Sequence, residues 1–491
     1  MGMKVLQSRG LELGNSNQNN EENFKPDSCY GARHTQIILL FILITLGYIM
    51  RVVLSVGIVA MTDPNASPNP NVPTYDWDDQ SVILSSFFFG YIVPQIAAGQ
   101  LAKYYGPKYF LLGAMTVTSL FSILIPVMAQ FGSWGVIVCR VFQGLSQGFM
   151  YPSCHHLLSR WAPLSERSRS SAFIYSGGPF GTVIGLPLTG WICGSWLGWP
   201  FAYYIYGALG LVWVVMWFFL GKNSPSEHTN MDPIERKYIE SSLNVAHDEK
   251  PIPTPWKSIF TSLPFWAILI AQTGQNWGFS TLLTNIPRYM AKVLHFDIES
   301  NGVLSAGPYL LYSVLSIIFS GITDWVVTRK TTSLSNTRKI ANTIGSVGPA
   351  VALIILGIIG SNSKDITIEA VALLYIAVGI NSATACGYQV NHMDIGPVHA
   401  GTLMGITNGL SNISSIIGPL IIQYIVTEES NPYQWATIFY ISAVVFFSGN
   451  LFFVIFGSGI VQAWNYSGKQ SSPISSEITT KNNNNEERNK Y

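Results

Sequence analysis

Two arginines, Arg51 and Arg140, lie inside long apolar stretches of the chain, and no aspartate or glutamate lies at comparable depth. In a membrane helix, an arginine at the centre of the bilayer costs roughly 2.5–3.5 kcal/mol. Two cations kept at this cost without a carboxylate partner indicate that another molecule supplies the negative charge. A bound anionic substrate is the simplest source, so the two arginines predict a binding site for an anion.

Helical geometry places polar residues beside both arginines. The residues that share a helical face with them are Tyr48 and Ser55 for Arg51, and Gln143 and Gln147 for Arg140. At 1.5 Å per residue, the two arginines lie about 15 Å and about 10 Å from the outer ends of their stretches, so both could line one cavity. An anion about 4 Å from a guanidinium gains on the order of 4 kcal/mol there. The alternative is that either arginine bonds backbone carbonyls and only fixes helix packing.

Other polar residues inside apolar stretches are further candidates for the site. In the seventh stretch, Gln275 and Asn276 belong to a polar band that we expect to form a second wall, with interhelical hydrogen bonding as the alternative. Tyr175, just before a Gly-Gly-Pro sequence, is a candidate aromatic contact for the ligand. The glycines that follow it at four-residue spacing, Gly177, Gly181 and Gly185, predict close helix packing.

Coupling and gating require charged or titratable groups on the path. Asp324 and Asp394 lie at the ends of stretches, where we expect them to serve gates on the cytoplasmic side. His155 and His156 could each titrate near neutral pH, with a structural hydrogen bond as the alternative for His155, and His392 is a further candidate.

Twelve apolar stretches are long enough to cross a membrane as helices, which takes about 20 residues. They cover 36–61, 80–101, 107–130, 133–158, 170–194, 199–221, 263–287, 300–323, 338–360, 367–392, 400–426 and 434–460. With 48% hydrophobic and 11% charged residues, the composition agrees. We therefore predict an all-α membrane protein with twelve transmembrane helices in two six-helix halves, 36–221 and 263–460. A cytoplasmic loop (222–262) would join them, and disordered cytoplasmic tails (1–35 and 461–491) would flank them.

The distribution of lysine and arginine predicts the topology. Most of these residues fall in connections that are cytoplasmic if the N-terminus is inside, among them Lys103, Arg160 and the residues of the central loop. The first outer loop is acidic and carries a glycosylation sequon at Asn65. The five cysteines have no metal-ligand spacing, and no basic block suggests nucleic acid.

One pattern resembles that of an enzyme. Gly144-Leu145-Ser146-Gln147-Gly148 fits the Gly-x-Ser-x-Gly sequence of a nucleophile elbow, which needs a strand, a turn and a helix around it. Here it lies in the middle of a stretch, where two glycines four residues apart predict a helix-packing notch instead. We expect no enzymatic activity, no metal and no cofactor, although Na⁺ is a candidate coupling ion.

Paired motifs in the two halves identify a family. Gly99-Gln-Leu-Ala-Lys103 with Gly106-Pro-Lys after the second stretch is echoed by Gly321-Ile-Thr-Asp324 with Arg-Lys after the eighth. This arrangement resembles the major facilitator superfamily, in which two repeats rock about a site near the midplane. Further strings, RVVLSV from Arg51, SFFFGY from Ser86, RVFQG from Arg140 and NHMDI from Asn391, resemble the anion transporters of solute carrier family 17.

The resemblance implies roles for matching residues and also marks departures. It implies that Arg51 binds the negative group of the substrate, that Arg140 takes part in the site or its coupling, and that His155 matches the span-four histidine of the family. Gln147 stands where sialin-like and glutamate-transporting members have a glutamate, so it cannot carry a proton. Lys103 stands where the loop motif has an acidic residue.

The sequence therefore predicts an alternating-access carrier of inorganic phosphate or an organic acid, driven by sodium or membrane potential. A lysosomal or vesicular carrier of acidic sugars or amino acids that uses histidine for a proton is the alternative. An anion channel is the alternative of another class. The expected partners are a small anion and the lipid bilayer, with the chain acting as a monomer. No convincing sorting signal occurs in either tail, which favours the plasma membrane.

Overall fold

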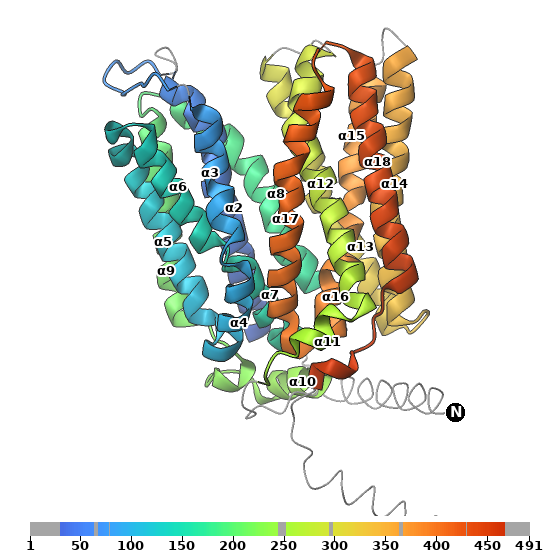
Figure 1. Cartoon of the computed structure of the whole chain (residues 1–491). Helices are drawn as coiled ribbons and strands as arrows, with labels where there is room; N and C mark the ends of the chain where they lie inside the picture. The colour runs from blue at the N-terminus through green and yellow to red at the C-terminus, as the bar shows by residue number, and fades with distance from the viewer. Residues whose placement is uncertain are drawn as a thin grey trace, which may run out of the picture.

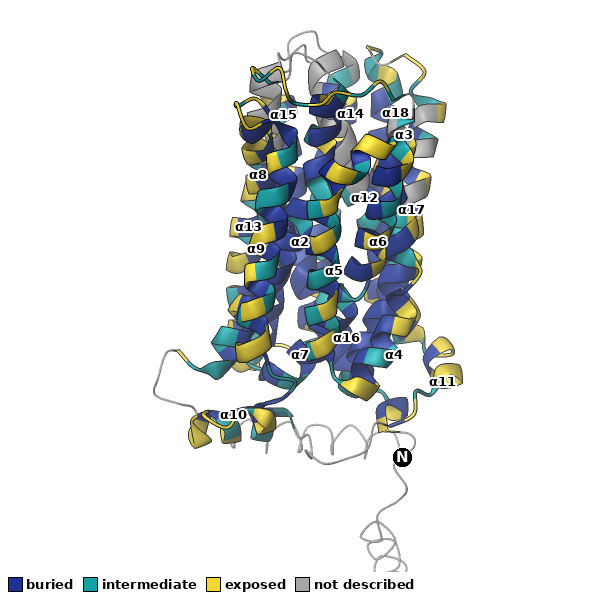
Figure 2. Cartoon of the chain, turned by 90° about the vertical axis from the view of Figure 1, so that its left-hand side faces the viewer, coloured by how far each residue is buried: buried dark blue, intermediate teal, exposed yellow. Residues whose placement is uncertain are grey.

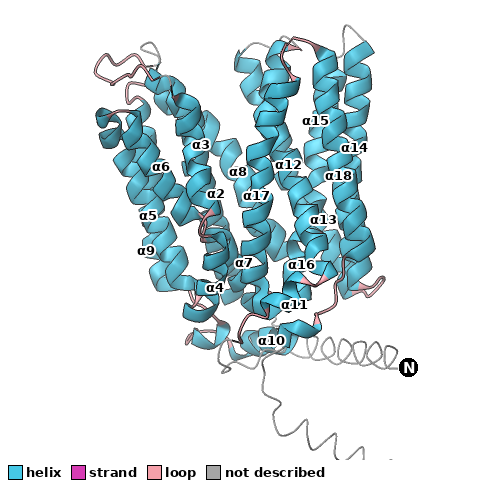
Figure 3. Ribbon diagram, viewed as in Figure 1, coloured by secondary structure: helices cyan, strands magenta, loops and turns pink. Residues whose placement is uncertain are grey.

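The computed structural model describes residues 30–62, 67–77, 79–243, 252–293, 298–362, 367–428 and 430–466. Every regular element within these ranges is a helix (Figure 3). The helices form two bundles whose lower ends converge and whose upper ends are spread apart (Figure 1). An all-helical fold is expected in lipid, because a helix satisfies its backbone hydrogen bonds within one segment.

The first bundle contains the first six spans. Its helices are α2 (Ala32–Thr62), α3 (Gln80–Ile92), α4 (Gln95–Tyr105), α5 (Pro107–Met128), η1 (Ala129–Phe131), α6 (Ser133–Gln147), α7 (Met150–Trp161), α8 (Arg167–Cys193) and α9 (Trp199–Leu220). The second predicted stretch is the pair α3 and α4, which are bent by 42°. Pro94 lies at this bend and has no N–H to donate. The fourth stretch is likewise the pair α6 and α7.

The second bundle contains the remaining six spans. Its helices are α12 (Leu263–Lys292), α13 (Ile298–Thr328), α14 (Leu334–Asn362), α15 (Thr367–Asn381), η3 (Ser382–Cys386), α16 (Tyr388–Ile395), η4 (Pro397–His399), α17 (Ala400–Ile425) and α18 (Pro432–Phe456). The tenth stretch is therefore a series of three short helices, α15, η3 and α16. Together the bundles give the twelve-helix arrangement in two six-helix halves that the apolar stretches predict.

Among the described residues, seven helical segments are long and apolar enough to cross a membrane by themselves, and the bent pair α3 and α4 qualifies as an eighth. The other spans, α6 with α7, α8, α12 and α17, carry more polar residues. Several of these polar residues lie between the helices, for example Gln147 on α6, Gln275 on α12 and Asn408 on α17, all of which are buried. Polar groups inside a membrane protein face the interior of the bundle rather than lipid, which explains the weaker apolar signal.

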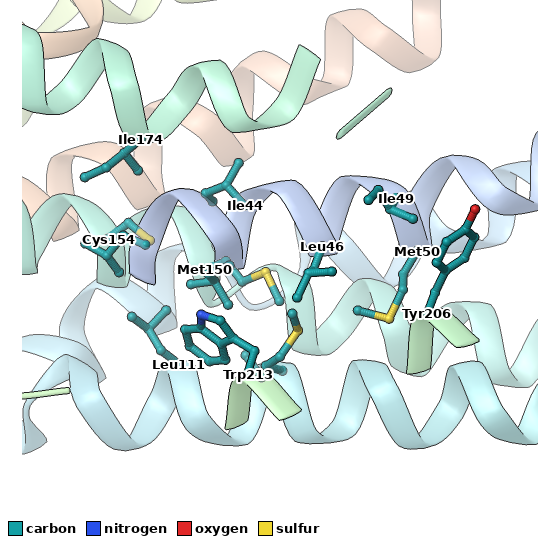
Figure 4. Close-up of a cluster of buried hydrophobic side chains, with 14 of the residues drawn as sticks. Ile44, Leu46, Ile49, Met50, Leu111, Met150, Cys154, Ile174, Tyr206 and Trp213 are labelled. Carbon is teal, nitrogen blue, oxygen red and sulfur yellow. The ribbon is translucent and has the colours of Figure 1, made fainter. Parts of the chain in front are cut away.

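Each bundle has its own apolar core. In the first bundle, α2 is surrounded by side chains of α5, α7, α8 and α9, among them the buried Leu111, Met150, Ile174 and Trp213 (Figure 4). Buried residues run along the inner faces of the helices, while exposed ones lie on the outer faces (Figure 2). Close helix packing depends on glycine: a Cβ at Gly181 of α8 would lie 2.5 Å from the carbonyl oxygen of Thr45 on α2. This is the packing that the glycine spacing predicts.

The two breaks in the second and fourth spans lie against each other. A Cβ at Gly148 would lie 2.5 Å from Cγ of Pro94, and one at Gly144 would lie 2.0 Å from the carbonyl oxygen of Phe87. Ser146, between these glycines, is buried and bonds the hydroxyl of Thr118 at 2.8 Å. The Gly-x-Ser-x-Gly sequence is therefore a helix-packing notch, as predicted.

Short helices line the lower end of the molecule (Figure 1). They are η2 (Pro225–Glu227), α10 (Pro233–Leu243) and α11 (Trp256–Phe260) in the connection between the bundles, and η5 (Ala463–Tyr466) after α18. Arg33, near the start of α2, bonds Glu166 and Glu235 at 2.9 Å each, which fixes α10 to the first bundle. Asn65 and most residues of the two tails lie outside the described residues, so the sequon and the disorder of the tails stay predictions.

Candidate functional site

Arg51 of α2 lies in an aromatic cage midway along the first bundle. The centre of its guanidinium is 4.6 Å from the ring centroids of Tyr48, Phe87 and Tyr91, which come from α2 and α3. Its Nη2 donates to Oε1 of Gln147 at 3.3 Å, and its Nε has no hydrogen-bond partner. Among the ion pairs of the described residues, none involves Arg51. The cage holds a cation that retains capacity for an anion.

Gln147 positions Arg51 rather than neutralising it. Its amide oxygen accepts from Arg51, and its Nε2 donates to the carbonyl oxygen of Gly47 on α2 at 3.1 Å. Both ends of the amide are therefore used, and the side chain carries no charge. Ser55, one turn farther along α2 on the same helical face as Arg51, is exposed.

Arg140 of α6 has a different environment. It is 3% exposed, and its Nη1 donates to the carbonyl oxygen of Met50 at 3.3 Å and to Oε1 of Gln143 at 3.1 Å. Its Nη2 donates to the carbonyl oxygen of Arg51 at 3.1 Å. These are the contacts of the packing alternative, since the guanidinium holds α6 against the backbone of α2. Arg140 thus fixes the part of α2 that carries Arg51.

A series of aromatic side chains leads from the cage toward the lower end of the first bundle. The Tyr48 hydroxyl is 3.1 Å from that of Tyr151 on α7, whose ring stacks on Tyr175 of α8 at 5.1 Å between centroids. The Tyr175 hydroxyl bonds Nδ1 of His155. Tyr175 is therefore connected to Arg51 through two tyrosines, one of which, Tyr151, the sequence reasoning missed.

The series continues across the seam between the bundles. The rings of His155 and His392 meet edge to face at 5.4 Å between centroids, and Nε2 of His392 lies 2.8 Å from the Thr407 hydroxyl. The carbonyl oxygen of Gln389 accepts from Nε2 of His155 at 3.2 Å and from Nδ1 of His392 at 3.0 Å. Because a carbonyl oxygen only accepts, these bonds place a proton on each of those two nitrogens.

The predicted second wall forms hydrogen bonds between helices of the second bundle. Gln275 donates to Ser346 at 2.8 Å and accepts from Asn381 at 2.6 Å, and Asn276 donates to Ser411 at 2.8 Å. These are the interhelical hydrogen bonds that the sequence offered as the alternative to a wall of the binding site.

Asn408 of α17 reaches the cage from the second bundle. Its Nδ2 donates to the Tyr91 hydroxyl at 3.1 Å and to Oε1 of Gln95 at 3.2 Å, and its Oδ1 accepts from Gln272 at 3.3 Å. Sequence reasoning missed Tyr91 and Asn408 as site residues. The signal was present, because both are polar groups within apolar stretches.

Asp324 and Asp394 lie at the lower seam, where the bundles are bonded together. Asp324 of α13 accepts from the backbone N–H groups of Ser168 and Arg169, at 3.1 and 2.8 Å, at the start of α8. Asp394 of α16 lies 3.3 Å from Arg167 of α8 and 2.7 Å from Arg338 of α14. A carboxylate at a helix N-terminus is favourable, since the helix dipole places partial positive charge there. The two aspartates therefore link the halves on this side.

Comparison with known proteins agrees with this architecture. The model of the Major Facilitator Superfamily matches residues 37–419. A "Putative inorganic phosphate cotransporter" of Drosophila melanogaster is 38% identical over 484 residues, which cover 93% of this chain and 91% of that protein. Human sialin is 37% identical over 89% of this chain and 91% of its own, and human vesicular glutamate transporter 2 is 36% identical over 79% and 67%.

Solved structures show the same fold at low sequence identity. The proton:xylose symporter XylE, bound to 6-bromo-6-deoxy-D-glucose, superposes with a TM-score of 0.66 at 16% identity, covering 87% of this chain and 98% of its own. FucP in the outward conformation gives a TM-score of 0.61 at 13% identity, covering 86% and 99%. The relatives named above are membrane transporters and not enzymes. This chain therefore belongs to the major facilitator superfamily and, within it, to solute carrier family 17, as a multi-pass membrane transporter.

Proposed function

We propose that this transporter carries a small anion by alternating access and that Arg51 is the cation that binds it. The observation that carries the proposal is the state of the Arg51 side chain. Its guanidinium lies midway along a span, among three aromatic rings, with Nε unpaired and no described carboxylate bonded to it. A cation at that depth is costly unless a counter-ion arrives, and an anionic substrate supplies that counter-ion.

Inorganic phosphate or an organic acid is the proposed substrate. The phosphate cotransporter named among the relatives supports the first, and sialin and the glutamate transporter support the second. The two terminal nitrogens of Arg140 donate to Met50, Arg51 and Gln143, and its Nε, like that of Arg51, has no hydrogen-bond partner. Because the terminal nitrogens of Arg140 are already used in these bonds, Arg51 supplies most of the free capacity to bind an anion, which favours an anion of low charge, such as monobasic phosphate or a monocarboxylate.

The proposed driving force is a sodium gradient or the membrane potential. Gln147 occupies the place beside Arg51 where a carboxylate could carry a proton, and an amide cannot do so. The plasma membrane is the proposed location. A proton-coupled carrier of acidic sugars or amino acids in a lysosomal or vesicular membrane is the second candidate. It is favoured by the series of tyrosines and histidines that connects the cage to His155 and His392.

Uptake into proteoliposomes tests the proposal. Labelled phosphate, sialic acid and glutamate would be supplied separately under sodium, proton and electrical gradients, with wild type and Arg51→Ala compared. Sodium- or potential-driven uptake that disappears in Arg51→Ala supports the proposal, and uptake driven only by a proton gradient supports the second candidate. Uptake that survives in Arg51→Ala refutes the role of the arginine.

Counterflow separates a carrier from an anion channel. Only a carrier exchanges labelled anion outside for unlabelled anion inside when no net gradient exists. Vesicles loaded with the unlabelled anion should therefore accumulate label transiently. A channel would let the label reach equilibrium without this overshoot, and that result would contradict alternating access.

A further inference from the structure

The lower seam has a second side with different chemistry. It lies where α4, η4 and the connection between the bundles meet, and its central residue is Lys103, in the last turn of α4. Lys103 is 6% exposed, and its Nζ lies 2.9 Å from Nδ1 of His399. Nζ also donates to the carbonyl oxygen of Ile252 and to Thr254 Oγ1, the latter at 3.3 Å. None of the ion pairs among the described residues includes Lys103.

Lys103 occupies the place in the first half that Asp324 occupies in the second. Asp324 accepts hydrogen bonds from the first N–H groups of α8, whereas Lys103 lies beside the start of α17, where a cation is unfavourable. His399 is the N-cap residue of α17. Its Nδ1 accepts the hydrogen bond of the Lys103 ammonium, which the N–H groups at the helix end cannot accept. The two sides of the seam therefore close by opposite chemistry, with carboxylates on one side and a lysine–imidazole bond on the other.

The lysine side joins three parts of the chain. Thr254 of the connection donates to Oε1 of Gln100 at 3.0 Å, and Nε2 of Gln100 donates to the Thr402 hydroxyl of α17 at 3.0 Å. The backbones also touch, since a Cβ at Gly99 would lie 2.5 Å from the carbonyl oxygen of Gly401. Any opening of the lower seam must break these contacts together with the bond between Lys103 and His399.

We propose that Lys103 and His399 form a latch of the cytoplasmic gate that holds while His399 is neutral and is released when His399 gains a proton. A neutral Nδ1 accepts from the lysine, but an imidazolium has no free lone pair and places a second positive charge beside the first. The charged and titratable groups facing His399 are Lys103 from α4 and His156 from α7, which in turn lies near Arg160. Trp464 and the backbone of Asn465 in η5 lie against His399 without adding charge. No described carboxylate offsets a proton there.

The direction of the pH response follows from the two states of the gate. In the closed state, burial and then the charge of Lys103 lower the pKa of His399 to about 3. When the halves separate, the imidazole returns toward its ordinary pKa of about 6.5. The open state then binds more protons, so acid favours opening to the cytoplasm. Between pH 7.4 and pH 5.5 the ratio of open to closed molecules should rise about tenfold.

A distance measurement across the seam tests the latch without any substrate, so its failure is distinguishable from failure of the proposed anion transport. Spin labels would be placed on Tyr109→Cys of α5 and Thr331→Cys between α13 and α14, both exposed, in the full chain with Cys29→Ser. The other four cysteines are buried. Double electron–electron resonance should show mainly a short distance between the two labels at pH 7.4. At pH 5.5 the ratio of long to short distances should be about tenfold larger than at pH 7.4.

Variants at three positions complete the test. His399→Asn keeps an acceptor for Lys103 but cannot gain a proton, so its pH response should fall below about twofold, with His399→Gln as a second variant if it folds poorly. His228→Gln, a control in the connection, should keep the full response. Lys103→Met should raise the long-distance fraction at pH 7.4. The latch is refuted by a wild type without pH response, by His399→Asn with the full response, or by Lys103→Met with unchanged distances.

Discussion

Replacing Gln147 by glutamate should make transport depend on acid. The Arg51 Nη2 donates to Gln147 Oε1 at 3.3 Å, so Gln147→Glu would place a carboxylate at the same distance from the guanidinium. At an effective dielectric constant of 20, unit charges this close attract by about 5 kcal/mol. Burial of the carboxylate costs several kcal/mol. A net attraction of about 1–3 kcal/mol remains, with which the substrate anion must compete.

The expected result is a KM for the transported anion that is about 5- to 150-fold higher than in wild type at pH 7.5. At lower pH the glutamate gains a proton and releases Arg51, so the KM should fall back toward the wild-type value. Initial rates of anion counterflow, measured in proteoliposomes from pH 7.5 to pH 5, would give both quantities.

Gln143→Glu is the matched comparison, because Gln143 contacts Arg140 at 3.1 Å and not Arg51. Its carboxylate should pair with Arg140 and leave the KM within about twofold of wild type. The reasoning is refuted if Gln147→Glu transports with an unchanged KM at pH 7.5, or if Gln143→Glu shows the same loss as Gln147→Glu.

Further predictions concern the packing and the gate. Arg140→Met should destabilise the protein by about 2–4 kcal/mol, because the carbonyl oxygens of α2 lose a buried charged donor, and a thermal melt in detergent should show a lower Tm than for Arg51→Met. Asp394→Asn should remove the carboxylate that pairs with Arg167 and Arg338, which should destabilise the closed seam by about 3–5 kcal/mol. Cys386 is buried in the wild type, so its alkylation should be faster in this variant. Gly181→Val should prevent close contact between α2 and α8, and a normal yield of folded Gly181→Val protein would contradict the packing described above.

The twelve spans and two halves could be predicted because a membrane helix must be apolar over about 20 residues, and that signal is local. The breaks within spans were less accessible. Pro94 marks the bend between α3 and α4, but the break between α6 and α7 lies at Gly148, which packs against Pro94 from another helix. Such a contact depends on how two spans meet, which periodicity within one span does not contain.

The candidate site shows the same division. The depth of Arg51 and the absence of a carboxylate near it were visible in the sequence. Its cage was not, because Phe87 and Tyr91 come from α3 and only tertiary packing brings them over the guanidinium. Arg140 was a candidate for the same site in sequence, with packing as its alternative, and in the structure its guanidinium faces the backbone of α2.

Lys103 departs from the loop motif for a reason that its neighbours in the sequence do not show. The sequence marked it as a basic residue where the loop motif has an acidic one. The compensating acceptor, His399, is 296 positions away in the chain and carries no pattern that points to a lysine. Only the assembled seam shows that the lysine has partners from both the second bundle and the connection.

Equilibrium binding of the transported anion to the purified protein tests the central claim most directly. Wild type and Arg51→Met would be compared for binding of the labelled anion, with a thermal melt to establish that both are folded. The anion gains on the order of 4 kcal/mol from the guanidinium before desolvation, so we predict at least about tenfold weaker binding in Arg51→Met. Equal affinity in a folded Arg51→Met variant would contradict the account and assign Arg51 to helix packing.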